Sequence, residues 1–486
     1  MFWLTDAPLS WLLLALGTVL FLYLNKPMAR GLPPSPGLWL PVVGHLYLME
    51  KNPRQQYLSW HKRLGPVVSI YLGNRLAIML FGYDTIQEAF VKQKNIFSER
   101  PDTYVTRQLS RDKGFVACGH QWKVQKKASL EILRRLGAQS GGLEEIIQVG
   151  ISHFIDEVTQ LKGQAFDPRP LLMTSVSNVV TAIAFGREFR HDDAETAECA
   201  RVLGEEIVHH DGMAALNFLP CLRYLPWDLF GLQKVKRLSE RLEENLVRKQ
   251  IQLCDDNHSF VSEYKKKMDP NKNTEICEEN LVGVVNNLFA AGTETVTTTL
   301  CWSLLYLLHN PACLERCCEE VRGHLGLQRR VEFKDRKTLL FTAATVMEVQ
   351  RIACISPLSI FHTASSDTEF RGWKIPKGCI ILPNLDSVML SEDVWQDPHQ
   401  FRPERFLQEG KLIKKDEFIP FSIGSRSCLG ENIATMELFL FITTILQKFN
   451  IVAKDAHHLP PLEGRFGLSC SPFPYEIILE PIAELC

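Results

Sequence analysis

The sequence predicts a mainly α-helical fold with small β-sheets, an α+β class. Long apolar patterns with helical periodicity cover four stretches, 279–309, 312–325, 338–353 and 431–449. The strand signals are shorter. Residues 67–80 predict a hairpin, because two β-rich runs flank Gly73 and Asn74, a pair that favours a tight turn. Asp84 is the expected N-cap of the helix after this hairpin, and 371–384 is strand-like with turn signals.

The composition is that of a globular protein with a large core. The 486 residues are 45% hydrophobic and 23% charged, and the net charge of -2 gives no indication of a nucleic-acid partner. The fourteen cysteines include no CxxC pair and no zinc-like cluster. Scattered, reduced thiols indicate a body that faces the cytosol. No low-complexity linker or repeat divides residues 38–486, so we expect them to form one catalytic domain.

Residues 1–25 are predicted to be a transmembrane anchor. Residues 7–24 carry no charge, and as a helix they would reach ~27 Å, close to the ~30 Å hydrocarbon core of a bilayer. Lys26 and Arg30 follow the run, so the positive-inside rule places the body in the cytosol. A cleaved signal peptide is the alternative, but the sequence lacks a basic n-region and a small-residue cleavage site. Residues 26–37 are proline-rich and form the expected hinge.

One segment, 216–232, is unusually apolar for a loop that contains two prolines. It is either part of the core or a second surface at the membrane interface. Tyr224 and Trp227 suit the second interpretation, because aromatic side chains with a polar edge favour that interface. The sequence leaves both interpretations open.

Cys428 is the main candidate for a metal ligand. Gly424 and Gly430 allow a tight backbone on either side of it, and an apolar helical pattern begins just beyond. A thiol near a helix N-terminus is expected to have a lowered pKa, because the dipole and the free N–H groups stabilise the thiolate. Arg426 offers a fixed cation to a carboxylate such as a haem propionate. A buried structural cysteine ahead of a helix is the alternative.

The pattern around this cysteine resembles the haem-binding signature of the cytochrome P450 superfamily. It follows the order F-x-x-G-x-R-x-C-x-G, with these residues at the fixed positions: Phe421, Gly424, Arg426, Cys428 and Gly430. The whole chain is most similar to the animal microsomal members that metabolise drugs and steroids, the family-two type. The resemblance implies the cytochrome P450 fold, with haem b between the long central helix and the helix after the cysteine loop. Cys428 is then the axial ligand of the haem iron, and Phe421, Arg426 and Gly430 belong to the cofactor-binding loop.

Glu294 and Thr295 form a candidate proton relay. They lie in 290-AAGTETVT-297, which is similar to the family's (A/G)-G-x-(D/E)-T-(T/S) motif inside the central helix. The resemblance implies that this acid and alcohol organise water and deliver protons to bound oxygen. Ala291 and Gly292 are expected to keep the helix face low and leave room for a macrocycle. The alternative is a threonine that bonds back to a backbone carbonyl, with the glutamate on a solvated face.

The resemblance also assigns residues that support the cofactor. Glu348 and Arg351 have the E-x-x-R spacing of a pair on one helix face, and Arg405 lies in a downstream P-E-R-F. In the family these three form a buried clamp behind the haem, with a role in folding and cofactor retention. Four further residues match family positions that hydrogen-bond a haem carboxylate: Arg100, Trp122, Lys126 and His362. Lys126 stands where most relatives have arginine, so it keeps the charge without the bidentate fork.

The implied function is that of a haem-thiolate monooxygenase. Such an enzyme inserts one oxygen atom of O2 into a lipophilic small molecule, here a steroid, a fatty acid or a foreign compound. Electrons would come from NADPH through the diflavin cytochrome P450 reductase, because the chain carries no dinucleotide or flavin motif. Cytochrome b5 is a candidate second partner. The expected location is the endoplasmic reticulum membrane, with a single-pass anchor and the catalytic domain in the cytosol.

Two other functions stay open at this point. A haem-thiolate isomerase or dehydratase rearranges peroxides without external electrons, and the Glu294–Thr295 pair argues against it. A membrane-anchored haem sensor would bind the cofactor and oxidise nothing, since a fold does not fix a function.

Overall fold

The computed structural model describes residues 10–11, 14–18, 31–110, 113–138, 142–186, 215–254, 258–269 and 275–482. Helices make up most of this part of the chain, and small sheets accompany them, which confirms the predicted α+β class. The principal helices run in this order: α2 (Arg54–Leu64), α3 (Tyr83–Gln87), α4 (Lys94–Phe97), α5 (Tyr104–Ser110), α6 (Gly119–Ala138), α7 (Gly142–Gln160), α8 (Pro168–Phe185), α10 (Leu232–Leu242), α11 (Lys249–Leu253), α12 (Phe260–Lys265), α13 (Glu278–His309), α14 (Pro311–Leu325), α15 (Leu340–Ala353), α16 (Asp386–Met389) and α17 (Glu431–Lys448).

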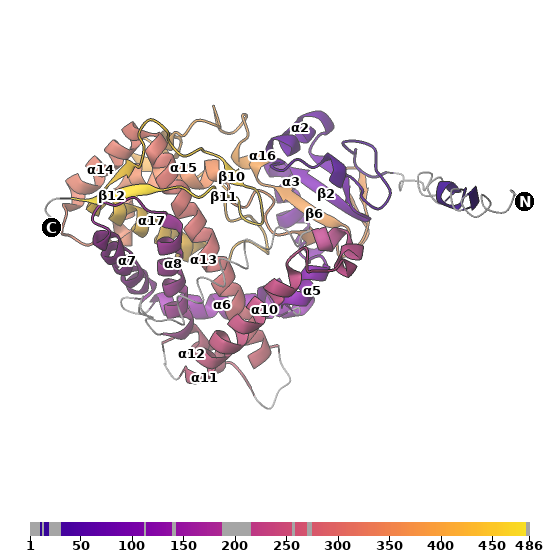
Figure 1. The fold of residues 1–486 in the computed structure, drawn as a ribbon, viewed down its shortest axis with the longest axis horizontal. Coiled ribbons are helices and arrows are strands. Elements are labelled where there is room, and N and C mark those ends of the chain that lie inside the picture. The colour runs from indigo at the N-terminus through magenta and orange to yellow at the C-terminus, as the bar shows by residue number, and fades with distance from the viewer. Residues whose placement is uncertain are drawn as a thin grey trace, which may run out of the picture.

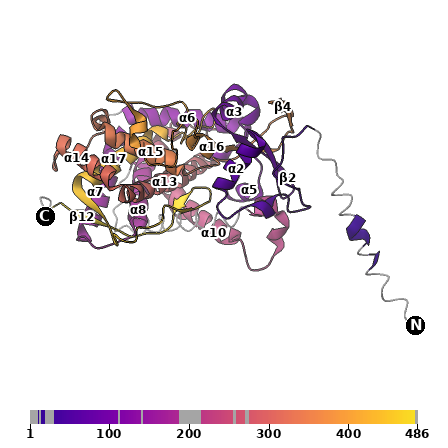
Figure 2. The same cartoon turned by 90° about the horizontal axis from the view of Figure 1, so that it is seen from above.

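The largest sheet has four strands in the order β1-β2-β6-β3. Its strands are β1 (Val67–Leu72), β2 (Arg75–Phe81), β6 (Ile380–Asn384) and β3 (His362–Thr363). The first two form the predicted hairpin, with Leu72 opposite Arg75 across the turn, and β6 then pairs parallel to β2. This sheet lies with α2 and α3 at one end of the molecule, and α7 and α14 lie at the other (Figures 1 and 2).

Four two-stranded sheets complete the set of strands. They pair β9 (Phe449–Ala453) with β12 (Ile477–Pro481), β10 (Gly464–Arg465) with β11 (Ser471–Pro472), β4 (Thr368–Phe370) with β5 (Trp373–Ile375), and β7 (Leu407–Gln408) with β8 (Lys411–Leu412). The strand-like stretch 371–384 therefore contains two separate strands, β5 and β6. They belong to different sheets because a turn at Pro376 to Gly378 separates them.

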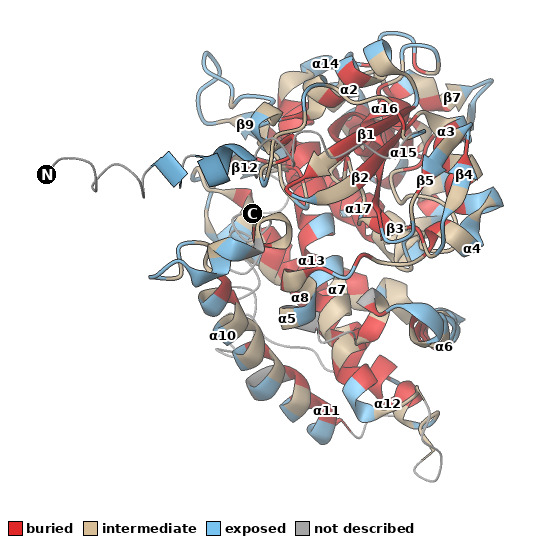
Figure 3. Ribbon diagram, turned by 90° about the vertical axis from the view of Figure 1, so that its right-hand side faces the viewer, coloured by how far each residue is buried: buried red, intermediate tan, exposed pale blue. Residues whose placement is uncertain are grey.

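The long helix α13 passes through the middle of the helical body and packs against α8 and α17 (Figures 1 and 3). It is apolar on nearly all sides, which is the pattern of a helix surrounded by others. It ends at His309 because Pro311 opens the next helix and the residue before a proline disfavours helical backbone. The helices predicted at 279–309, 312–325, 338–353 and 431–449 are all confirmed, with bounds that differ by no more than two residues.

Two local expectations are changed by the structure. The predicted N-cap Asp84 is wrong: α3 begins at Tyr83 after Gly82, so Asp84 lies in the first turn and its side chain caps nothing. The described part of the expected hinge, residues 31–37, is hydrogen-bonded to the body of the protein. Ser69 donates to the carbonyls of Pro33 and Pro34, and Lys374 donates its backbone N–H to the carbonyl of Gly31. This segment therefore adheres to the sheet end of the body.

The predicted anchor, residues 1–25, lies largely outside the described residues. Within the part of the chain that is described, none of the helices combines the length and the apolar character that crossing a bilayer requires.

Segment 216–232 was expected to be either core or a surface at the membrane interface, and its parts differ in burial. Leu216 and Leu232 are buried and form a small cluster with Val105 and Val235. In contrast, the side chains around the following turn point outward, with 76% exposure for Tyr224 and 90% for Trp227. The ends of the segment are therefore core, and the turn between them presents an apolar surface to its surroundings.

Candidate active site

The loop that carries Cys428 is fixed by its own backbone and by its neighbours. The N–H of Cys428 donates to the carbonyl of Phe421 at 3.0 Å, and α17 begins at Glu431 with Gly430 as its N-cap residue. Gly424 has a φ of +84°, and a Cβ there would lie 2.3 Å from the carbonyl oxygen of Phe90. Only glycine satisfies both conditions. The loop therefore approaches the backbone of Phe90 so closely that position 424 admits no side chain.

Cys428 is accessible to solvent although the surrounding protein partly encloses it. Its side chain is exposed, yet burial by the surrounding protein raises the pKa of its thiol. The hydrogen bond from the backbone N–H of Gly430 and the charge of Lys126 oppose this increase only in part. The expectation that the helix N-terminus lowers this pKa is therefore wrong for the protein alone, because desolvation exceeds the dipole effect. A bound metal ion would change that balance, because a coordinated thiol is deprotonated.

Lys126 holds the cysteine loop. Its ammonium group, on α6, donates to the carbonyls of Ser425 at 2.8 Å and Ser427 at 3.0 Å. Burial lowers the pKa of Lys126, and the charges of Arg426 and Arg100 lower it further. In this structure Lys126 thus contacts the loop backbone on either side of Arg426.

The middle of α13 carries small side chains that are exposed. Ala290, Ala291 and Thr295 are exposed, although the helix is otherwise buried along most of its length. Because other helices pack along α13, this exposed stretch is a gap in the packing around the helix. The expected role of Gly292 needs correction, because it packs against α8: a Cβ there would lie 2.9 Å from a Val180 methyl group. The small side chains that leave space on this face of α13 are those of Ala290, Ala291 and Thr295.

Two arginines near the cysteine lack a carboxylate partner. Arg100 donates to the carbonyls of Ile360 and Phe361, and Arg426 donates to those of Ser98, Phe115 and Ala117, but neither forms an ion pair within the described residues. Burial lowers the pKa of Arg100 to about 9, and the charge of Arg426 adds to this. Burial likewise lowers the pKa of Arg426 to about 10. Two cations held this close together in partial burial fit an anionic ligand.

Trp122 and His362 border the same region. The indole N–H of Trp122 is buried and has no hydrogen-bond partner, and the Arg426 guanidinium stacks on the ring at 3.7 Å. An unsatisfied buried donor beside two unpaired cations is what a cofactor carboxylate would satisfy. His362 lies on β3, stacks on Phe90 and bonds the carbonyl of Phe97 through Nδ1. Burial lowers its pKa well below the usual value, and the charge of Arg100 acts in the same direction.

Glu294 and Thr295 are bonded to different groups. The hydroxyl of Thr295 donates back to the carbonyl of Ala291 at 2.7 Å, and the residue is exposed. The Glu294 carboxylate is 5% exposed and accepts two hydrogen bonds from Arg169 Nη2, at 2.8 and 2.7 Å. Thr298 and Ser469 also donate to it. The structure therefore leaves the alcohol accessible on α13 and places the acid in a buried ion pair beside it.

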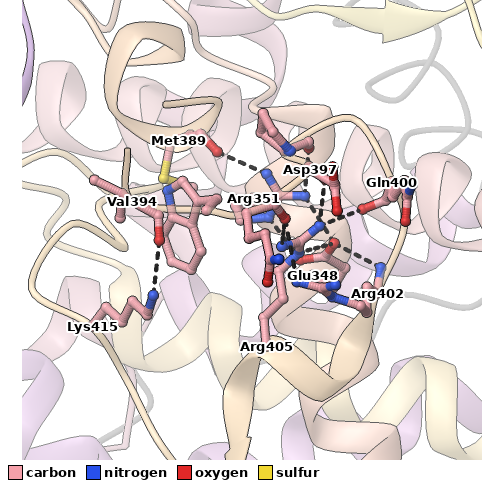
Figure 4. A network of polar contacts seen from close by, with 12 residues as sticks. Glu348, Arg351, Met389, Val394, Asp397, Gln400, Arg402, Arg405 and Lys415 are labelled. Atoms are coloured by element: carbon pink, nitrogen blue, oxygen red, sulfur yellow. Dashed lines mark hydrogen bonds and ion pairs between the residues drawn. The ribbon is translucent and has the colours of Figure 1, made fainter. Parts of the chain in front are cut away.

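Glu348 is the centre of a buried ionic cluster (Figure 4). Both Glu348 and Arg351 are 0% exposed, and Arg351 donates to the two carboxylate oxygens at 2.7 and 2.8 Å. Arg405, in the 3-10 helix η7 (Pro403–Phe406), donates to the same carboxylate at 3.1 Å. The remaining N–H groups of the two arginines bond five backbone carbonyls, those of Met389, Gln396, Asp397, Pro398 and Gln400. The structure thus brings together the three residues that were expected to form a clamp.

The comparisons with known proteins settle the family. Residues 33–479 match the family described as "Cytochrome P450". The chain belongs to this family. It is 34% identical over 495 residues to human "Cytochrome P450 2U1", an alignment that covers 94% of this chain and 90% of the relative. It is 34% identical over 489 residues to mouse "Cytochrome P450 2J5", with 97% and 96% covered, and 33% identical over 491 residues to pig "Vitamin D(3) 25-hydroxylase", with 96% and 98% covered.

This cytochrome P450 is therefore a monooxygenase of the family-two type with a haem-thiolate centre. The residues around Cys428 fit the cofactor, since an accessible cysteine, two partly buried arginines without an ion-pair partner among the described residues and an unpaired indole N–H are the groups that an iron and its porphyrin carboxylates require. Cys428 would hold the iron, and Arg100, Arg426 and Trp122 would hold the haem carboxylates.

Sequence reasoning missed two residues of this site, Arg169 and Ser469. Both bond the Glu294 carboxylate, from 125 and 175 residues away along the chain. Arg169 lies in the first turn of α8, where Asp167 accepts its backbone N–H as the N-cap and Pro168 precedes it. No local pattern distinguishes this arginine from an ordinary first-turn residue. Only the packing of α8 against α13 brings it to Glu294.

Replacing Glu348 should reduce the free energy of unfolding far more than replacing Glu404, a surface glutamate in η7. Glu348→Gln leaves two buried arginines with no carboxylate, so we expect a loss of about 3–5 kcal/mol in unfolding free energy and weakened haem retention. Chemical denaturation followed by circular dichroism, with haem absorbance read in parallel, measures both effects.

Glu404→Gln is the matched control. Glu404 precedes Arg405 and pairs with Arg316 at 2.6 Å, but both side chains are about half exposed. Its loss should cost no more than about 1 kcal/mol. Equal costs for the two variants would contradict the special role of Glu348.

Proposed function

We propose that this cytochrome P450 oxidises a lipophilic small molecule with electrons that come from NADPH through a diflavin reductase. The observation that carries the proposal is the accessible side chain of Cys428, in a chain whose residues 33–479 match the cytochrome P450 family. Apolar side chains near the site support a lipophilic substrate, since Ile360 and Leu468 are each more than half exposed. The pig relative's name, "Vitamin D(3) 25-hydroxylase", supports the same class of substrate.

Within this proposal each part of the site has a separate task. When bound, a haem with a thiolate ligand favours cleavage of the O–O bond of dioxygen. Cys428 supplies that thiolate, and the hydrogen bond from Gly430 to its sulfur moderates the charge. Arg100, Arg426 and Trp122 fix the orientation of the cofactor through its carboxylates. The enclosing helices exclude bulk water, which strengthens every electrostatic interaction inside.

Thr295 is the proposed carrier of protons into the site. The residue is exposed and its hydroxyl already makes one hydrogen bond, so it can pass a proton between water and a bound oxygen. Glu294 belongs to the proposal as the adjacent acid. To act directly it has to exchange a bond to Arg169 for one to water, because Arg169, Thr298 and Ser469 occupy its oxygens.

Removing the hydroxyl of Thr295 should uncouple the reaction. Thr295→Val keeps the shape of the side chain, so we expect normal cofactor loading but about tenfold less product per NADPH consumed, with the missing O2 recovered as hydrogen peroxide. Thr299→Val is the control, since that hydroxyl is buried and bonds the carbonyl of Thr295. Unchanged product yield in Thr295→Val would exclude the relay.

Cys428→Ser tests the centre of the proposal. We expect the variant to lose both the red-shifted Soret band of the reduced carbon monoxide complex and all product formation with NADPH and reductase, because serine provides no thiolate. Cys118→Ser should keep both properties, although Cys118 is also exposed and its thiol donates to the carbonyl of Arg100. Turnover that proceeds without NADPH would instead favour an isomerase or dehydratase. Intact spectra with no oxidation of any lipophile would favour a haem sensor.

We further propose attachment to the endoplasmic reticulum membrane, with residues 1–25 as the anchor, 26–37 as the hinge and 38–486 as the catalytic domain in the cytosol. The outward-facing Tyr224 and Trp227 support a second contact with lipid. The full chain should stay in the membrane pellet after carbonate extraction, while protease added to intact microsomes should digest the catalytic domain. Release by carbonate, or protection from protease, would contradict this topology.

A further inference from the structure

A pair of thiols lies outside the active site, on the first two turns of α14. Cys313 and Cys317 are four residues apart, so their side chains lie on one face of the helix. Both sulfurs approach the same oxygen, the hydroxyl of Thr345 on α15, at 3.7 Å from Cys313 and 3.3 Å from Cys317. That hydroxyl also donates to the carbonyl of Phe341 at 2.9 Å. The helix spacing and the shared neighbour therefore hold the two sulfurs close together.

The two thiols differ in accessibility and in reactivity. Cys313 is half-buried and is the third residue of α14, where free backbone N–H groups and the helix dipole favour a thiolate. A hydrogen bond from the Cys317 thiol lowers the pKa of Cys313 further. Cys317 is 0% exposed. Cys313 can thus meet a reagent first, and Cys317 is positioned to complete a second bond.

A direct disulfide does not suit this geometry. Side chains at this helical spacing have Cβ atoms ~5–6 Å apart, whereas a disulfide requires ~3.5–4.5 Å. Closing the bond would therefore unwind the first turns of α14. A bridging atom that bonds both sulfurs spans the larger distance and leaves the helix intact.

We propose that Cys313 and Cys317 form a dithiol site for trivalent arsenicals. Arsenic in this state is thiophilic and binds two thiolates. With phenylarsine oxide as the ligand, the bond between arsenic and oxygen breaks and two As–S bonds form. The two thiol protons leave with that oxygen as water, and no electron is transferred.

The position of the pair links such binding to the haem site. Thr345 lies one helical turn before Glu348 on α15, and Arg316, between the two cysteines, pairs with Glu404 of η7. An arsenic atom bridging the sulfurs disturbs the thiol contacts to Thr345, and α15 and η7 carry the three residues of the ionic cluster around Glu348. Occupation of the dithiol should therefore loosen that cluster and speed the loss of haem.

The test uses the full-length, haem-loaded protein with phenylarsine oxide in excess glutathione. Intact-mass and peptide-mass spectra should show one phenylarsenic group bridging Cys313 and Cys317, resistant to the monothiol and removed by 2,3-dimercaptopropanol. Cys313→Ser and Cys317→Ala should retain no arsenical. Cys318→Ser, which removes the half-buried neighbour of Cys317, should bind like the unmodified protein.

Circular dichroism shows whether each variant folds. If Cys317→Ala does not fold, Cys313→Ser still provides the test, because Cys313 is only half-buried. An arsenical that survives glutathione in Cys313→Ser would overturn the proposal, as would failure of the unmodified protein to retain one. Transfer of haem to apomyoglobin gives the second readout. It should become several-fold faster on arsenical treatment of the unmodified protein and of Cys318→Ser, and stay unchanged in Cys313→Ser. An adduct that leaves this rate unaltered would overturn the link to the haem site.

Discussion

The buried ion pairs of Glu348 with Arg351 and Arg405 are the interactions on which the surrounding structure depends. The Glu348 carboxylate is inaccessible to solvent and receives hydrogen bonds from Arg351 on its own helix and from Arg405, which is 57 residues further along the chain. The arginines in turn bond backbone carbonyls of the connection that follows α16, between Met389 and Gln400. Because such carbonyls have no sheet or helix partners, the two guanidinium groups give this irregular segment a defined conformation. The buried charges thus specify one arrangement of a segment that regular hydrogen bonding cannot hold.

The cofactor region is organised on the opposite electrostatic principle. Around Glu348 each arginine has a carboxylate partner, whereas Arg100 and Arg426 are cations without an ion-pair partner in the described structure, and burial lowers the pKa of both. Trp122 adds an unsatisfied buried N–H. Leaving these two cations and this N–H without partners reduces the stability of the folded protein. An anionic ligand that pairs with them increases that stability, because a ligand that binds only the folded state shifts the folding equilibrium toward it. If the cofactor binds as proposed, its carboxylates couple haem binding to the folding of this region.

The acid and the alcohol of the central helix illustrate how neighbouring residues take different environments. Successive side chains on a helix point about 100° apart, so Thr295 is exposed while Glu294 points toward α8 and the segment between β10 and β11. There it bonds Arg169 and Ser469. One consequence is that the acid joins three separate parts of the chain, α13, α8 and the segment between β10 and β11. The Glu294 carboxylate is a structural link in this conformation, and the proposed role in proton transfer requires a change in its bonds.

The sequence by itself determined the fold class, the long helices, the hairpin and the family, because each depends on local periodicity or on a short motif of fixed spacing. Cys428 and the Glu348–Arg351 pair belong to such motifs, and the resemblance that they carry is enough to select Arg405 from a distant segment. The sequence did not reveal that desolvation raises the pKa of Cys428, that Gly292 packs against α8, or that Arg169 holds Glu294. Those properties depend on which surfaces meet when helices pack. Only the tertiary structure decides them, since burial and ion pairing arise between residues that are far apart along the chain.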